Sequence, residues 1–314
     1  MGIDISVIVP TYNEEENVEK LYGELIKVLS ELALDYEIIF VDDCSTDATN
    51  RKLLELHKKN PFIKIIRLRK NFGQSAAMKA GFDHAKGKRV ITMDADLQND
   101  PNDIPALLAK MEEEDLDVVC GWRYNRQDSF AKRFFSNISN RLRKILTKEI
   151  IHDSGCTLRA YKKECINEIE LYGELHRYIP AILFWRGYRV GEVKTNHRDR
   201  IFGKSKYNWK RLFKGFLDLL VITFWQKYST RPMHMFGGVG IILGSTGFII
   251  SLYLVIERLF FGMGLSDRPL FIVGIFLIVI GVQFFAFGIL ADIMMKVYHY
   301  GNGRKNYLIE KVVG

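Results

Sequence analysis

Residues 89–100, RVITMDADLQND, carry two carboxylates directly after a stretch that is typical of a buried strand. Val90, Ile91 and Met93 are the apolar side chains of that strand. Side chains alternate along an extended chain, so Asp94 and Asp96 point to the same side. Two like charges so placed repel each other unless a positive group lies between them. The stretch therefore predicts a strand that ends at a positively charged ligand.

Strand-like and helix-like segments alternate around this stretch. In chain order the segments are 5–10, 13–32, 36–41, 45–59, 63–68, 74–87, 89–94, 102–114 and 117–121. Asn13 is a candidate N-cap of the first helix, and Glu16 completes a capping-box pattern with it. Alternation of this kind predicts an α/β fold with a mostly parallel sheet and helices on both faces.

Polar side chains gather where the predicted strands end, in PTYNE (10–14), VDDCSTD (41–47), RKNFGQ (69–74) and MDADLQ (93–98). Ligands of such sheets bind beyond the carboxyl ends of the strands. The carboxylates of Asp94 and Asp96 and the amide oxygen of Gln98 suit a hard divalent cation, Mg²⁺ or Mn²⁺, which commonly bridges phosphates. A second D-x-D, Asp115 and Asp117, lies at a predicted helix-to-strand turn and is interpreted as solvated charge.

Two later segments, 236–256 and 270–290, contain no charged residue. At about 1.5 Å per residue each is long enough to cross a hydrocarbon core of about 30 Å. Two membrane-spanning helices are favoured over two buried helices of a soluble core. Basic residues flank this hairpin on both sides, which predicts that the large N-terminal part and both termini are cytoplasmic. These basic residues are Lys206, Lys210, Arg211, Lys214, Lys227 and Arg231 before it, and Lys296, Arg304, Lys305 and Lys311 after it.

The composition limits the partners and the compartment. The formal charge is +8, but the basic residues concentrate near the apolar segments, so anionic lipid and an anionic substrate are expected rather than nucleic acid. The four cysteines show no paired metal spacing, which indicates free thiols in a reducing cytoplasm.

The domain boundaries follow from these patterns. Residues 1–205 are expected to form the catalytic domain, 206–232 interfacial amphipathic helices, 233–298 the two spans and 299–314 a cytoplasmic tail. An earlier amphipathic stretch, 129–148, either packs on the domain or lies at the interface. Glycines form a stripe on each span, which allows close helix packing. One stripe can pack the hairpin on itself and the other is left for a second protomer, so a homo-oligomer is predicted.

Eight motifs in order carry a resemblance to a known family. They are VIVPTYNEEENV, FVDDCSTDAT, RKNFGQSAAMKAG, MDADLQNDP, GWR, DSGCTLRAY, ELHRYIPA and HRDRIFGKSKY. Together they resemble the family-2 glycosyltransferases of the dolichol-phosphate mannose synthase type, which load sugar onto polyprenyl phosphate. The resemblance covers the whole chain and implies a GT-A Rossmann-like fold. The two-span end is similar to the bacterial glucosyl-transferring branch.

The resemblance also implies roles for individual residues. The nucleotide-sugar site is expected to contain Pro10, Tyr12, Glu14, Asp42, Asp43, Asn71, Gly73, Asp94 and Asp96. The metal ligands are expected to be Asp94, Asp96 and Gln98. The residues expected at the acceptor or donor phosphates are Arg123, Arg133, Ser136, Arg200 and Lys206. Asp94, Asp96, Arg200 and Lys206 are the expected catalytic residues.

Three positions qualify this assignment. Asp42 has the alternative role of capping or orienting a loop, and Asp153 that of fixing one. Cys44 stands where the family most often has glycine, which changes a turn but removes no ligand.

The implied reaction is transfer of a hexose, with glucose from UDP-glucose favoured by the branch resemblance, to a polyprenyl phosphate. The acceptor phosphate is already largely ionised near pH 7, so a single inverting displacement without a general base is expected. A processive polysaccharide synthase is disfavoured because Q-x-x-R-W is absent and Trp185 and Arg186 occur in the other order. A diacylglycerol acceptor remains open. A non-enzymatic membrane scaffold or transporter is disfavoured because Gln283 is almost the only strong polar group in the spans.

Overall fold

The computed structural model describes residues 2–124, 151–167, 169–171, 173–198, 224, 232–262, 264, 268–300 and 306–314, with side chains up to 294 in the last long helix. The chain forms two compact units. Residues up to 219 and from 305 on make an α/β unit, and residues 220–304 make a helical unit.

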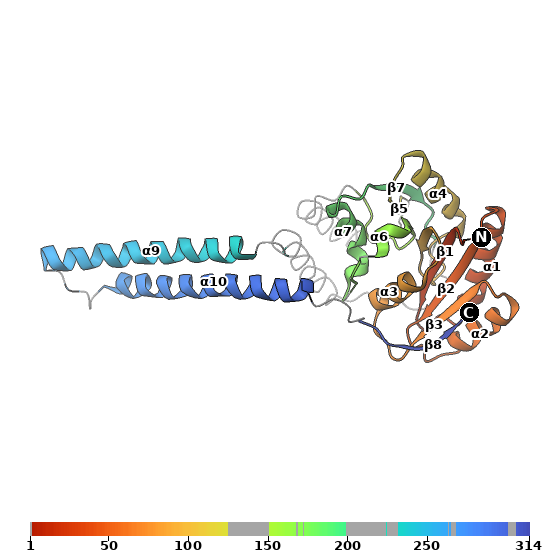
Figure 1. Ribbon diagram of the computed structural model, residues 1–314, viewed down its shortest axis with the longest axis horizontal. Coiled ribbons are helices and arrows are strands. Elements are labelled where there is room, and N and C mark those ends of the chain that lie inside the picture. Colours follow the sequence, from red (N-terminus) through yellow and green to blue (C-terminus); the bar gives the residue numbers. More distant parts are fainter. Residues whose placement is uncertain are drawn as a thin grey trace. The chain divides into compact units, whose positions relative to one another are not determined.

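The described elements of the α/β unit follow the alternation expected from the sequence (Figure 1). They are β1 Ile5–Thr11, α1 Val18–Glu31, β2 Tyr36–Asp42, α2 Thr49–Lys59, β3 Ile63–Leu68, α3 Gln74–His84, β4 Arg89–Thr92, η1 Pro101–Asp103, α4 Ile104–Glu113, β5 Val118–Arg123, β6 Arg159–Lys162, α6 Lys163–Asn167, η2 Leu175–Tyr178, α7 Ile179–Trp185, β7 Val190–Thr195 and β8 Ile309–Val313.

One eight-stranded sheet organises this unit, in the order β7-β5-β6-β4-β1-β2-β3-β8. β1 pairs in parallel with β2 and β4, β2 with β3, and β5 with β7. β6 runs antiparallel to β4 and β5, and β8 runs antiparallel to β3. The prediction of a mostly parallel sheet is confirmed. The polar ends of β1, β2 and β4 consequently meet at one edge.

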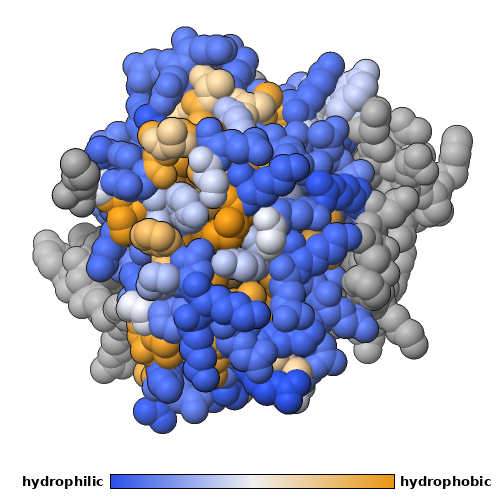
Figure 2. Space-filling model, turned by 90° about the vertical axis from the view of Figure 1, so that its right-hand side faces the viewer, coloured by the Kyte–Doolittle hydropathy of each residue, from blue (hydrophilic) through white to orange (hydrophobic). Residues whose placement is uncertain are grey.

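Helices cover both faces of the sheet, as predicted, because alternate strand residues point to opposite sides. Val7, Phe40 and Ile91 belong to the core cluster on the face covered by α1, α2 and α4. Ile8 and Ile39 belong to the cluster on the face covered by α3, α6 and α7. The surface of the unit on the side of the chain ends is mainly hydrophilic, with small apolar patches (Figure 2).

The first helix begins later than the capping-box pattern predicts, at Val18, so the cap at Asn13 is wrong. Asn13 has φ +57°, in the left-handed region, and cannot start the helix there. Its side chain instead accepts a hydrogen bond of 2.8 Å from the backbone N–H of Thr46, and its own N–H donates to Ser45 Oγ at 3.0 Å. The loop after β1 is thereby fixed to the loop after β2.

Strand β8 is a feature that the sequence patterns do not predict, since residues 299–314 are expected to form a tail. The segment before it is also built into the α/β unit. The Tyr307 ring is buried and its hydroxyl donates to Asp83 at 2.6 Å. The N–H of Arg69 donates to the carbonyl of Leu308 at 2.9 Å. The end of the chain is therefore an integral part of the sheet.

The helical unit contains α9, Pro232–Phe261, and α10, Pro269–Tyr300, both long and apolar enough to cross a membrane. The most apolar 18-residue window has a mean hydropathy of 2.2 in α9 and of 2.8 in residues Pro269–Met294 of α10. Only 17% and 11% of the residues in their most apolar windows are buried, whereas a core helix of a soluble protein is mostly buried. The low burial of both helices within the described structure favours two membrane-spanning helices over two soluble-core helices. The predicted interfacial segment 206–232 and the stretch 129–148 lie almost entirely outside the described residues.

The glycine stripes of the two helices face each other. A Cβ atom added to Gly240 would lie 2.6 Å from the carbonyl oxygen of Gly281, and one added to Gly247 would lie 2.4 Å from that of Gly274. Both stripes are thus used inside the hairpin. The premise that one stripe is left over for a second protomer is wrong, and the homo-oligomer stays a prediction without that support.

We expect Gly281→Ala to destabilise the hairpin, because the new Cβ atom would lie 2.5 Å from the backbone nitrogen of Gly244 and 2.7 Å from the oxygen of Gly240. Backbone atoms cannot rotate away, so the helices must separate, at a cost of about 1–3 kcal/mol. Thermal unfolding in mild detergent measures the effect. Gly238→Ala is the matched control, since no atom lies within 4 Å of its added Cβ. Equal melting temperatures of the two variants would contradict the packing.

Candidate active site

A cavity of about 390 Å³ lies at the carboxyl ends of β1, β2 and β4. Its lining residues are Pro10, Thr11, Tyr12, Glu14, Asp43, Asn71, Gly73, Gln74, Ala77, Asp94, Ala95, Asp96 and Glu174. Eight of the residues predicted for the nucleotide-sugar site are among them. The eight are Pro10, Tyr12, Glu14, Asp43, Asn71, Gly73, Asp94 and Asp96. The structure therefore brings together the ends of strands that lie far apart in the sequence.

Asp94 and Asp96 form the acidic part of the cavity. Burial and, next, the charge of Asp96 raise the pKa of Asp94 to about 6. Hydrogen bonding from Thr157 and the charges of Arg123 and Arg159 act in the opposite direction without cancelling the rise. The Gln74 amide donates to Asp94 Oδ1 at 2.7 Å. The repulsion between two like charges, inferred from the sequence, is thus present in the folded site.

These two carboxylates fit a divalent cation that carries a substrate. Among the residues that the structure describes, no three or more His, Cys, Asp or Glu side chains are grouped to hold a metal. A cation here would take two protein carboxylates and complete its shell with phosphate oxygens and water, which is the usual habit of Mg²⁺. Both donors are hard oxygen ligands, so Mg²⁺ or Mn²⁺ suits them better than a softer metal.

Gln98 does not line the cavity within the part of the chain that the structure describes. Its backbone N–H donates to Asp96 Oδ1 at 3.2 Å, and its carbonyl accepts from the N–H of Arg198 at 2.9 Å. Leu97, between the two residues, has φ +62°. Gln98 shapes the turn that holds Asp96, while its role as a metal ligand stays a prediction.

Asp43 joins two walls of the cavity. Its carboxylate oxygens accept hydrogen bonds from the N–H groups of Phe72 at 2.7 Å and Gly73 at 2.8 Å. Burial raises the pKa of Asp43, and these two bonds reduce the rise. Gly73 has φ +91°, a conformation that glycine adopts readily and other residues avoid. The end of β2 thereby fixes the loop that leads into α3.

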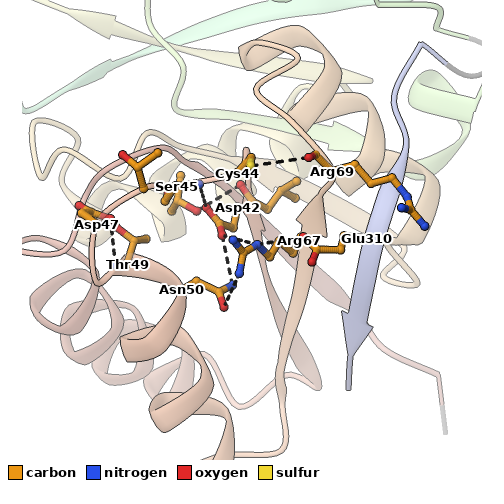
Figure 3. Close-up of polar contacts among 12 residues, drawn as sticks. Asp42, Cys44, Ser45, Asp47, Thr49, Asn50, Arg67, Arg69 and Glu310 are labelled. Atoms are coloured by element: carbon orange, nitrogen blue, oxygen red, sulfur yellow. Dashed lines mark hydrogen bonds and ion pairs between the residues drawn. The ribbon is translucent and has the colours of Figure 1, made fainter.

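Asp42, in contrast, is fully buried at the end of β2 and does not line the cavity in the described structure. Its Oδ1 accepts from the N–H of Ser45 at 2.9 Å and its Oδ2 from the amide of Asn50 at 3.1 Å (Figure 3). These contacts correspond to the alternative role of orienting the loop. Cys44, in the loop between Asp42 and Ser45, has φ +62°, which explains why glycine suits this position.

Arg123, at the end of β5, forms a two-pronged pair with Asp153. Its Nε lies 2.6 Å from Asp153 Oδ2 and its Nη2 lies 2.9 Å from Oδ1. Each side chain is only 15% exposed, so the pair is largely withdrawn from water. The positive charge of Arg123 also acts on Asp94 and lowers its pKa. Asp153 thus fixes a guanidinium group close enough to influence the acidic part of the cavity.

Three polar residues of the cavity, Thr11, Gln74 and Glu174, are not among the predicted site residues. Gln74 is the last residue of the strand-end segment RKNFGQ, so the polar strand-end pattern was the available signal. Glu174 opens the motif ELHRYIPA and pairs with Arg177 at 2.9 Å. The same segment is fixed to the start of α3, because His176 Nδ1 lies 2.9 Å from Ser75 Oγ.

The interpretation of the second D-x-D, Asp115 and Asp117, as solvated charge is wrong for Asp117. Asp115 is exposed, but Asp117 is buried and accepts from Arg189 Nη2 at 3.2 Å and Lys162 Nζ at 2.8 Å. Burial raises the pKa of Asp117, but the hydrogen bonds from Arg189 and then Lys162 outweigh it and lower the pKa to about 2. This pair has its positive partners within the protein, which distinguishes it from Asp94 and Asp96.

Four predicted phosphate contacts, Arg133, Ser136, Arg200 and Lys206, lie outside the described residues.

The mostly parallel sheet, with an acidic cavity at the carboxyl ends of its strands, places the chain in the class of α/β proteins whose ligand sites lie at strand ends. More particularly, the chain belongs to glycosyl transferase family 2, whose sequence profile matches residues 6–170. It is therefore a glycosyltransferase, and the resemblance recognised in the motifs is confirmed.

Curated relatives match along the whole chain. The dodecaprenyl-phosphate galacturonate synthase of Rhizobium johnstonii is 38% identical over 99% of this chain and 93% of its own. The undecaprenyl-phosphate 4-deoxy-4-formamido-L-arabinose transferase of Proteus mirabilis is 37% identical over 99% of this chain and 94% of its own.

Among solved structures, glucosyl-3-phosphoglycerate synthase of Mycobacterium tuberculosis in complex with Mn²⁺ and UDP-glucose has a TM-score of 0.55. It is 17% identical and covers 72% of this chain and 79% of its own. At this identity the likeness shows the fold alone.

Proposed function

We propose that this glycosyltransferase moves a hexose from a nucleoside-diphosphate sugar to the phosphate of a membrane polyprenyl phosphate. The observation that carries the proposal is the cavity in which Asp94 and Asp96 meet the ends of β1 and β2. The full-length similarity to two transferases named for polyprenyl-phosphate acceptors supports the acceptor class. UDP-glucose is the donor that the branch resemblance favours.

Donor binding is assigned to the cavity. We assign the nucleotide to Pro10, Tyr12, Glu14, Asp43, Asn71 and Gly73, and Asp42 to the loop beneath it. Asp94 and Asp96 are assigned to a divalent cation that would neutralise the charge growing on the departing diphosphate. The complex of the structural relative with Mn²⁺ and UDP-glucose supports such a cation.

Acceptor binding needs cations rather than a base. A phosphate monoester is largely ionised near pH 7, so its oxygen can attack the sugar carbon without losing a proton to the protein. The attack comes from the face opposite the leaving diphosphate and inverts the configuration at that carbon. Arg123, which lies in the described part of the chain, is assigned to the phosphates. The motif match assigns Arg133, Ser136, Arg200 and Lys206 to the phosphates as well.

The membrane arrangement belongs to the same proposal. Helices α9 and α10 cross the inner or plasma membrane, and the α/β unit lies on the cytoplasmic side with both termini. Support comes from the basic flanks and from the chain path, because residues after α10 return to the same compact unit as residues before α9. A chain that enters the membrane and returns to the same side crosses it an even number of times, which two spanning helices satisfy. We retain 206–232 as an interfacial segment and the homo-oligomer as further parts of the proposal.

The test is a matrix of labelled nucleotide sugars and lipid acceptors. UDP-glucose, UDP-galacturonate and a UDP-linked formamido-arabinose are incubated with polyprenyl phosphate or diacylglycerol, and UDP release and lipid-linked sugar are measured. We expect release that requires polyprenyl phosphate, and a product of opposite anomeric configuration to the donor. Transfer to diacylglycerol but not to polyprenyl phosphate would overturn the acceptor assignment.

A further inference from the structure

A β-bulge occurs where the C-terminal strand β8 pairs with β3. Arg67 lies opposite Lys311, while the next residue, Leu68, lies opposite Ile309. Glu310 is therefore the extra residue of the bulge, with no strand partner opposite it. Bulges redirect a side chain and are common beside active sites. Here the bulge directs Glu310 onto Arg67, with its Oε2 3.2 Å from Arg67 Nε (Figure 3).

Arg67 also contacts Asn50, which in turn contacts Asp42 next to the donor cavity. Its Nη1 donates to Asn50 Oδ1 at 3.3 Å, and Asn50 Nδ2 donates to Asp42 Oδ2 at 3.1 Å. Arg67 Nε also lies 3.8 Å from the same Asp42 oxygen. Glu310, Arg67, Asn50 and Asp42 thus form a continuous polar chain from the end of the protein to the loop after β2 (Figure 3).

The two carboxylates at the ends of this polar chain differ in their exposure to water. Asp42 is 0% exposed, so its contacts are with protein groups and not with water, whereas Glu310 is 48% exposed and can be changed without opening the core. The guanidinium of Arg67 is shared between the two carboxylates. Without Glu310 it is free to move toward Asp42, where it competes with the Asn50 hydrogen bond. Asp42 holds the N–H of Ser45, and its neighbour Asp43 lines the cavity.

We propose that Glu310 is a positioning residue for donor binding, which acts through Arg67 and Asn50 on the loop that carries Asp43. This inference rests on the proposed nucleotide role of the cavity. Its consequence is that the residues following the membrane hairpin take part in shaping the donor site. Removal of the whole strand would be uninformative, because Tyr307 and the ladder to β3 also hold the sheet edge.

The test is Glu310→Ala in the full-length protein. We expect the KM for the nucleotide sugar to rise about two- to fivefold, the range expected for loss of a half-exposed ion pair. The kcat and the KM for polyprenyl phosphate should change less than this. A merely structural role would instead lower the amount of active enzyme and leave both KM values unchanged. Glu310→Gln, which keeps an acceptor oxygen, should restore part of the donor affinity.

Lys311→Ala is the matched control, because it removes a charge from the same strand one residue away, and it should leave the donor KM unchanged. Asn50→Ala supplies a double-variant cycle. If both residues act on Asp42 through Arg67, the effects of Glu310→Ala and Asn50→Ala are smaller together than their product. A donor KM for Glu310→Ala equal to that of the unchanged protein would overturn the inference.

Binding of UDP in the presence of Mn²⁺, measured by calorimetry, distinguishes failure of the positioning role of Glu310 from failure of the proposed nucleotide site. Weaker UDP binding by Glu310→Ala than by the unchanged protein supports the positioning role. Equal UDP binding by the two proteins overturns the positioning role but leaves the proposed function intact. Absence of UDP binding by the unchanged protein overturns the nucleotide assignment of the cavity itself.

Discussion

Asp94→Asn and Asp96→Asn should each lower kcat by about a thousandfold or more, while the protein stays folded. Each substitution removes a charged oxygen at the cavity. Loss of a cation that stabilises the departing diphosphate removes several kcal/mol of transition-state stabilisation, and about 4 kcal/mol corresponds to a thousandfold. Sugar transfer to polyprenyl phosphate, with UDP release measured in parallel, checks the effect. Activity that persists in EDTA would contradict the role of the two carboxylates.

Asp115→Asn is the matched control, since it alters the other D-x-D at a side chain that is 72% exposed and outside the cavity. We expect it to leave kcat within about twofold, because exposed ion pairs contribute little. A readout independent of turnover is the rise in melting temperature caused by Mn²⁺ with UDP. The unchanged protein and Asp115→Asn should show it, and the Asp94 and Asp96 variants should not.

The pKa of Asp94 gives the same site a pH dependence. The pKa is raised to about 6 in the folded, metal-free protein, whereas the unfolded chain has the ordinary aspartate pKa of 3.8. Between these two pH values the folded protein keeps a proton on Asp94 that the unfolded chain has lost. The stability of the metal-free protein therefore falls as the pH rises through this interval. Asp94→Asn, which carries no charge, should consequently raise its melting temperature at pH 7. Below about pH 6 the proton competes with the cation, so more Mn²⁺ should be needed for binding.

The position of the site could be predicted from the sequence because strand ends follow a local rule. Polar residues that end buried strands meet at one edge of a parallel sheet, and this rule led to the segments 41–47 and 93–98, which contain Asp43 and Asp94. The same rule cannot separate Asp42 from Asp43, because alternation says only that neighbouring residues point to opposite sides. The fully buried position of Asp42 depends on Asn50 and Arg67, and Arg67 lies on another strand.

Features that depend on distant partners were beyond local patterns. Asp117 looks like solvated charge until Arg189, 72 residues later, is placed beside it. Asn13 is of a residue type that commonly caps helices, yet its contacts to the loop after β2 hold it in a left-handed conformation. Strand β8 is five residues long, and its pairing with β3 closes a loop of more than two hundred residues. No pattern within a short window carries that information.

Arg123→Lys should lower kcat/KM by about ten- to hundredfold, the loss expected when one hydrogen bond to a charged group, about 1.5–3 kcal/mol, is removed. Lysine keeps the positive charge but lacks the planar fork that binds both oxygens of Asp153 while leaving a further N–H for a phosphate. The alternative is that the pair with Asp153 only stabilises the fold.

Arg189→Lys distinguishes these roles, because Arg189 makes a similar fork to Asp117 but is not among the groups that shift the pKa of Asp94. Both variants lose a two-pronged ion pair, so both should melt at a lower temperature than the unchanged protein. Only Arg123→Lys should lose activity per folded molecule, since Arg123, unlike Arg189, lies close enough to Asp94 to lower its pKa. Activity that falls in both variants merely in proportion to the folded fraction would show that Arg123 has a structural role and that the phosphates are held by other cations.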